Sequence, residues 1–186
     1  ALYKKVLAKF PKNKKAIEGY QKLKAGVSSL SAKETEPPQQ QMKELIRQYN
    51  QGQYKIVLLK IRNLISLFPK STILYNIEGS ANDALKNYKD AVESYKKAIK
   101  NNPSYAESYF NIGNTFKNMK NFNEAINSYK KAIKIQPDDA EFYSNMGNVF
   151  YLNGDVESAI KYYKRSVNLN PNLFVSYNNL GEALKD

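Results

Sequence analysis

Asparagines recur at one place in this sequence, and their chemistry suits the binding of another chain. Asn111, Asn145 and Asn179 each stand two residues before a glycine and are spaced 34 residues apart. A primary amide both donates and accepts hydrogen bonds, so a row of amides can match the N–H and C=O groups of an extended peptide without reading its side chains. We call these three residues the asparagine ladder. Asn114 and Asn148 follow two of them after three residues and extend the pattern.

A simpler explanation of the ladder also stands, because asparagine is frequent in this chain and an exposed helix face tolerates it. Against it, asparagine in mid-helix costs a few tenths of a kcal/mol relative to alanine, so a regular series is more than neutral variation needs. If each amide contributes a net of about 0.5 to 1.5 kcal/mol, a few of them support only weak, roughly micromolar binding once the peptide has been ordered.

Missing residue types exclude most other chemistry. The chain has no Cys, no His and no Trp, so it has no disulfide, no Cys or His metal site, and no Ser-His or Cys-His nucleophile. It has no glycine-rich phosphate loop, and we expect the paired carboxylates Asp138 and Asp139 to begin a helix, where the dipole favours negative charge. We therefore expect no catalysis, no metal and no cofactor in this chain.

An internal repeat of 34 residues predicts the elements that must position the amides. Three residue types share the period: Pro69, Pro103, Pro137 and Pro171; Gly79, Gly113, Gly147 and Gly181; Tyr75, Tyr109, Tyr143 and Tyr177. Between them, apolar residues recur at helical spacing in two stripes. In one unit these stripes are Tyr109, Ile112, Gly113 and Phe116, then Ala125, Tyr129, Ala132 and Ile133. Proline cannot continue a helix and closes the second one, so each unit is predicted to be two amphipathic helices.

Two units match one known pattern throughout. The residues are Tyr109, Ile112, Gly113, Phe116, Ala125, Tyr129 and Pro137, then Tyr143, Met146, Gly147, Phe150, Ala159, Tyr163 and Pro171. This resembles the tetratricopeptide repeat, which reads aromatic, x2, Leu-Gly, x2, Tyr, then Ala-x3-aromatic, then Pro. The unit at 72–105 departs from it with Glu78 and Asn82 where Leu and Tyr are expected. We expect its first helix to pack less well.

The resemblance implies an all-α, right-handed α-solenoid in which the first helices of the units line a concave groove. The asparagine ladder would face this groove, and it is similar to the asparagines by which the repeat arm of O-linked N-acetylglucosamine transferases holds peptide backbones. Phe110, Lys117 and Tyr151 lie on the same helices and are added as candidate peptide-binding residues from family geometry. Because the unit at 72–105 has Ile77 at the ladder position, with Asn76 beside it, the ladder is expected to begin one unit later.

The period and the punctuation divide the chain into seven parts. These are partial, basic repeat helices at 1–26, a linker at 27–38, a degenerate unit at 39–71, complete units at 72–105, 106–139 and 140–173, and the first helix of a truncated further unit at 174–186. The linker is rich in Ser, Glu, Thr and Pro without an apolar period. The last helix has an apolar stripe without a following partner, so the chain is expected to be a fragment.

Positive charge is concentrated at the N-terminal end. Of the net charge of +12, residues 1–34 supply nine Lys against two Glu, whereas residues 72–186 nearly balance. The cluster of Lys12, Lys14, Lys15, Lys22 and Lys24 could meet an anionic surface, but a soluble helix face is the simpler interpretation.

Paired bases also recur on the second helices, at Lys96-Lys97, Lys130-Lys131 and Lys164-Arg165. We interpret them as a solvated outer face, with Glu93 and Lys97 paired at i, i+4. On the first helices, a carboxylate clamp of the kind some family members use fits badly. That surface offers Lys117 and Lys185, but also Glu107, Glu141 and Glu182, and no Arg.

The expected function is that of a protein–protein interaction scaffold that binds an extended segment of a protein or peptide in the groove. One alternative is a head-to-tail homo-oligomer through exposed terminal helices, with residues 174–186 stacked on the N-terminal helix of another copy. Another is the substrate-presenting arm of a downstream glycosyl- or sulfotransferase-like domain, in which case the whole protein would be an enzyme. Partners of nucleic acid or membrane are not expected, since no apolar run approaches the roughly 20 residues of a spanning helix. A cytoplasmic location is expected.

Overall fold

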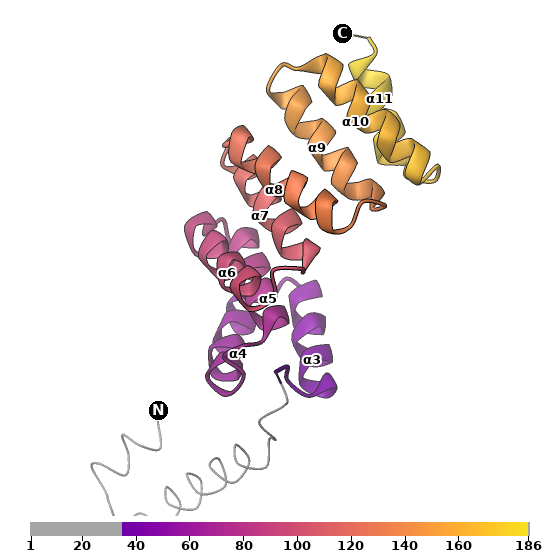
Figure 1. The fold of residues 1–186 in the computed structure, drawn as a ribbon. Helices are drawn as coiled ribbons and strands as arrows, with labels where there is room; N and C mark the ends of the chain where they lie inside the picture. The colour runs from indigo at the N-terminus through magenta and orange to yellow at the C-terminus, as the bar shows by residue number, and fades with distance from the viewer. Residues whose placement is uncertain (1–34, 186) are drawn as a thin grey trace, which may run out of the picture.

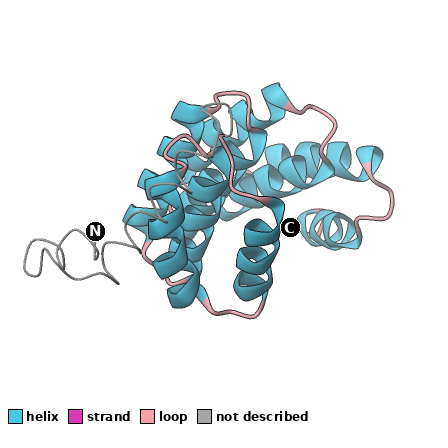
Figure 2. Ribbon diagram, turned by 90° about the horizontal axis from the view of Figure 1, so that it is seen from below, coloured by secondary structure: helices cyan, strands magenta, loops and turns pink. Residues whose placement is uncertain are grey.

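The computed structural model describes residues 35–185, and in this part of the chain helices are joined by short loops with no strand (Figure 2). The helices are α3 (Gln39–Asn50), α4 (Tyr54–Leu67), α5 (Thr72–Ala84), α6 (Tyr88–Asn101), α7 (Ala106–Asn118), α8 (Phe122–Ile135), α9 (Ala140–Leu152), α10 (Val156–Leu169) and α11 (Phe174–Ala183). They stack from α3 and α4 at one end to α11 at the other (Figure 1). The predicted all-α solenoid is confirmed. The predictions for residues 1–34 lie outside the described residues.

The stack has two layers. Each of α5, α7 and α9 packs against the helix that follows it, and α5, α7, α9 and α11 also contact one another in succession. We call these four the first-helix layer, and α6, α8 and α10 the second-helix layer. Each second helix in turn packs on the first helix of the next pair. Residues with the same place in successive units are therefore neighbours across the stack.

Short turns set the angle between the two helices of a pair. The turn residues Gly52, Lys86, Lys120 and Gly154 all have positive φ, between 60° and 83°. After each of them an N–H reaches back over the helix end, as from Asn121 to the Phe116 carbonyl at 2.8 Å, which closes the helix with a left-handed cap. Lysine has to adopt at two of these turns a conformation that glycine adopts freely.

The core of each complete pair is a tyrosine ring seated on a glycine. A Cβ added at Gly79, Gly113 or Gly147 would lie 2.5 to 2.7 Å from the ring of Tyr95, Tyr129 or Tyr163, the fourth residue of the Ala-x3-aromatic pattern. Only glycine leaves room for so close an approach. We call this contact the glycine slot.

The unit at 72–105 accommodates its two departures from the pattern with polar contacts. Glu78 accepts a hydrogen bond from the Ser94 hydroxyl of α6 at 2.9 Å, and Asn82 is buried. Helix α5 packs on α6 as closely as α7 packs on α8. The expectation that this first helix packs less well is wrong, because the carboxylate gains a partner on the facing helix.

The paired bases of the second helices do more than face solvent. One base of each pair lies over a first-helix tyrosine: Lys97 over Tyr75 at 5.7 Å, Lys131 over Tyr109 at 5.8 Å, and Arg165 over Tyr143 at 5.7 Å from the ring centroid. The expected pair of Glu93 and Lys97 does not form, since Glu93 bonds Lys96 at 2.9 Å instead. Repeated cation–π contacts of this kind contribute roughly 0.5 to 1 kcal/mol each at exposed sites.

Candidate binding face on the first helices

The ladder asparagines are partly buried on α7, α9 and α11, and each is hydrogen-bonded to its surroundings. Asn111 donates from Nδ2 to Oδ1 of Asn76 on α5 at 3.3 Å, and Ser108 Oγ lies 3.1 Å from the same oxygen. Asn76 is buried. The residue beside the missing ladder position in α5 therefore anchors the first ladder amide.

Asn145 connects α9 with α7. Its Oδ1 accepts a hydrogen bond from Lys117 Nζ at 3.0 Å, and its Nδ2 donates to the Glu141 carbonyl at 3.1 Å, one turn earlier. Both ends of this amide are thus held, which fixes the plane of the side chain.

Asn179 repeats the arrangement on α11. Its Nδ2 donates to Oδ1 of Asn148 on α9 at 2.8 Å. The same oxygen accepts a hydrogen bond from the Tyr163 hydroxyl at 2.7 Å. Each ladder amide is thus tied to the preceding first helix.

These bonds leave every ladder amide some capacity. Asn111 and Asn179 each use one N–H, and Asn145 uses one N–H and one oxygen lone pair. An amide has two N–H donors and two oxygen lone pairs. In each case one N–H and at least one lone pair remain for a ligand.

Asn114 and Asn148 hold the core tyrosines. The hydroxyl of Tyr129 donates to Asn114 Oδ1 at 2.6 Å, as that of Tyr163 donates to Asn148. In the preceding pair Ser80 takes this position and lies 3.1 Å from the Tyr95 hydroxyl. A buried phenol needs an acceptor, so a polar residue directly after the slot glycine satisfies a need of the core.

Two of the aromatic candidates belong to the packing between helices. Phe110 is only 9% exposed and stacks on Phe142 of α9 at 4.8 Å between centroids. Its ring cannot contact a bound segment, and the prediction that it does is wrong. The reason is that α9 lies against α7 in the solenoid, which covers this position. Tyr151 is partly buried against the cluster that contains Tyr163 and Ala183.

Lys117 is the only cation on helices α5, α7, α9 and α11. Burial lowers the pKa of its ammonium group, and the nearby Asp83 carboxylate opposes this shift. Asp83 itself accepts from the Thr115 hydroxyl at 2.7 Å and from Asn118 Nδ2 at 3.4 Å. The cation is therefore engaged by neighbours of the same layer.

Carboxylates gather where α7 and α9 begin, and the search for binding residues in the sequence missed them. Burial raises the pKa of Glu107, and Asp139 and Glu141 raise it further by repulsion. In residues 35–185 no cation lies within ion-pair distance of Glu107 or Glu141. Their common place in two successive units was the signal, because it puts both at the start of a first helix.

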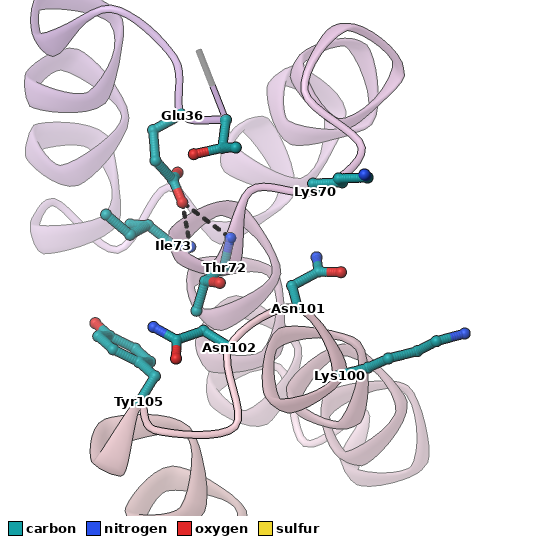
Figure 3. A pocket seen from close by; sticks show the side chains of 9 residues that line it. Glu36, Lys70, Thr72, Ile73, Lys100, Asn101, Asn102 and Tyr105 are labelled. Carbon is teal, nitrogen blue, oxygen red and sulfur yellow. Dashed lines mark hydrogen bonds between the residues drawn. The ribbon is translucent and has the colours of Figure 1, made fainter. Parts of the chain in front are cut away.

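A cavity of about 600 Å³ lies apart from the ladder, between the start of α5 and the loop that joins α6 to α7. Figure 3 shows the Glu36 carboxylate in it, where it accepts from the backbone N–H of Thr72 at 2.9 Å and lies 3.5 Å from that of Ile73. It also accepts from the Ser71 hydroxyl. A helix start attracts anions, so Glu36, from the stretch assigned to the linker, fastens that stretch to α5.

Other kinds of site are not found in the described residues. Between residues 35 and 185 no three His, Cys, Asp or Glu side chains are grouped as metal ligands would be. Over the same range no helix has the length and apolar character needed to cross a bilayer.

Family models for the repeat match the part of the chain that carries the binding face. A TPR repeat model matches residues 79–120 and 119–154, and a tetratricopeptide repeat model matches 140–173. Together they span residues 79–173, just over half of the chain. The chain belongs to the tetratricopeptide repeat family. Membership supports a protein-interaction scaffold, since this repeat fold is typically not catalytic.

Solved structures of tetratricopeptide proteins share the fold. A crystal structure of MamA is 24% identical, with a TM-score of 0.66, over 91% of this chain and 85% of that one. The first TPR of Spaghetti (RPAP3), bound to the HSP90 peptide SRMEEVD, is 22% identical, with a TM-score of 0.59, over 61% and 90%. Cut9-Hcn1 of the APC/C is 18% identical, with a TM-score of 0.70, over 75% and 28%. A comparison with curated proteins finds no match.

Proposed function

We propose that this tetratricopeptide chain binds an extended protein segment along its first-helix layer, with the asparagine ladder contacting the segment's backbone. The observation that carries the proposal is the free capacity of Asn111, Asn145 and Asn179. Each is held in orientation by the preceding first helix, and each keeps both a donor and an acceptor. A preorganised amide loses little entropy on binding.

A similar fold lends support at the level of architecture. The RPAP3 domain, which resembles this chain, is bound to the peptide SRMEEVD of HSP90. At 22% identity this shows that the shared fold is compatible with a bound peptide. The residues that would carry binding in our chain have to be argued from its own side chains.

The test is a triple variant, Asn111→Ala, Asn145→Ala and Asn179→Ala, measured against peptides selected by the unchanged protein from a display library. We expect at least a tenfold loss of affinity, because three backbone contacts disappear. The matched control replaces three exposed second-helix asparagines, Asn63, Asn127 and Asn168, by alanine. Unchanged affinity in the ladder variant, with normal helix content, would leave the ladder a purely structural feature.

A second candidate function is self-assembly, and the end of the stack favours it. On α11, Phe174 is 75% exposed, Val175 58% and Tyr177 46%. A Cβ added at Gly181 would meet nothing within 4 Å, so the last glycine slot is open. Apolar surface of this kind can pair with another copy.

Light scattering over a concentration series tests this candidate. Assembly through α11 predicts a molar mass that rises with concentration, and a monomer in the variant Phe174→Ser, Val175→Ser. A single monomeric mass at every concentration would rule assembly out for this chain.

A further inference from the structure

The two layers of the solenoid have opposite charge, although the chain as a whole is basic. Helices α6, α8 and α10 carry ten bases and four acids. Helices α5, α7, α9 and α11 carry one base, Lys117, and five acids, namely Glu78, Asp83, Glu107, Glu141 and Glu182. The layer that holds the asparagine ladder is thus the acidic side of a protein with a net charge of +12.

The acids of this layer differ in what they already bind. Glu78 accepts from Ser94 of the second layer, and Asp83 lies next to Lys117 and accepts from Thr115. Glu107 and Glu141, by contrast, are exposed and have no ion-pair partner in residues 35–185. They stand at equivalent places on α7 and α9, each four residues before a ladder asparagine.

The spacing aligns these acids with the amides. Residues four apart on a helix lie on one face, one turn from each other. Glu107 with Asn111 and Glu141 with Asn145 therefore form two rows across the same helices. A segment whose backbone follows the amides would carry its side chains past the two carboxylates.

We infer that the first-helix layer selects an extended segment that carries lysine or arginine side chains, which Glu107 and Glu141 receive, and that it rejects acidic segments. The inference rests on the proposed function, which supplies the backbone contacts, and adds the class of partner. Charge of opposite sign speeds association and excludes wrong partners, whereas like charge opposes binding. The acids are exposed, so the selection depends on salt.

The test compares three labelled twelve-residue peptides with a common Ala/Ser/Gln frame that carries four Lys, four Glu or no charge. Binding is followed by fluorescence polarisation, and weak binding by NMR titration. We expect the Lys peptide to bind at least tenfold more tightly than the Glu peptide, with the neutral peptide in between. The preference should shrink several-fold when salt is raised from about 50 to 300 mM, as for exposed charges.

A charge-removing pair identifies the acids that act. Glu107→Gln with Glu141→Gln should lose most of the preference for the Lys peptide and leave the binding of the neutral peptide unchanged. The matched control, Glu124→Gln with Glu157→Gln, removes the same charge from exposed positions of α8 and α10 and should behave like the unchanged chain.

Two outcomes would overturn the inference, and they separate it from the proposed function. If all three peptides bind equally and the ladder variant weakens all of them, backbone binding stands and charge selection fails. If no peptide binds at millimolar concentration, or if the control pair has the same effect as the Glu107 and Glu141 pair, the layer is not a charge-selective binding face.

Discussion

Three glycine slots of this solenoid are filled, and one is open. At Gly79, Gly113 and Gly147 a tyrosine ring from the following helix leaves no space for a methyl group, whereas Gly181 on α11 faces nothing within 4 Å. The same residue type therefore serves close packing in the middle of the stack and contributes nothing to packing at its end. A tetratricopeptide unit is stable only when the next helix covers it.

The largest expected effect comes from emptying a filled slot. Tyr129→Ala removes a fully buried ring from Gly113 and should lower the free energy of unfolding by about 3 to 5 kcal/mol, the usual range for aromatic residues cut to alanine in a core. Urea unfolding measures it. The control Tyr177→Ala, on exposed α11, should cost less than about 1 kcal/mol. Equal losses for both would mean that the slot is not a centre of packing.

Filling a slot with a methyl group should have opposite signs at the two places. Gly113→Ala puts a Cβ 2.6 Å from the Tyr129 ring and should cost about 1 to 3 kcal/mol by overpacking. Gly181→Ala adds helix propensity in open space and should gain up to about 1 kcal/mol. Thermal unfolding of both variants decides the sign. Destabilisation by Gly181→Ala would show that the last slot is covered in solution, as by a second copy.

Removing one hydroxyl tests the bond between the slot and the asparagines. Tyr129→Phe keeps the ring but leaves Asn114 Oδ1 without its 2.6 Å donor, which should cost about 1 kcal/mol. In the double variant Tyr129→Phe, Asn114→Ala the second change should cost less than it does alone, which a double-mutant cycle measures. Strict additivity would contradict the pairing.

Alkaline pH should weaken the filled slots. Burial raises the pKa of Tyr163 to about 12, from an ordinary value of 10.0. The folded state thus holds a proton that the unfolded state releases, so the stabilisation is complete below pH 10 and is lost as pH rises from 10 to 12. Unfolding curves across this range should show the decline, and Tyr163→Phe should reduce it. An identical pH dependence in that variant would contradict the account.

The sequence predicts the repeat and the helix pairs because a few contacts dictate residue types at fixed spacing. Gly113 must be glycine under the Tyr129 ring, and Pro137 must end a helix, so a period of 34 residues is visible without any structure. The contacts between successive units could not be predicted in this way. The burial of Phe110 against Phe142 depends on how one pair sits on the next, which spacing does not encode.

Choices among polar partners were also beyond the sequence. Lys97 can reach both Glu93 and Tyr75, and only the packing of α6 on α5 decides for the ring. Asn114 was predicted to face a ligand, but its oxygen serves the Tyr129 hydroxyl, a demand that arises only once the ring is buried. Glu36 belongs to a stretch without periodicity, so no pattern places it at the start of α5.

The role of the asparagine ladder can be observed most directly through the side-chain amide signals of the protein in NMR. On titration with the Lys peptide, the account predicts that the Nδ2 signals of Asn111, Asn145 and Asn179 shift together with one saturation curve, while those of the exposed second-helix residues Asn127 and Asn168 stay in place. Shifts confined to the second-helix asparagines, or to those near α11 alone, would contradict binding along the first-helix layer.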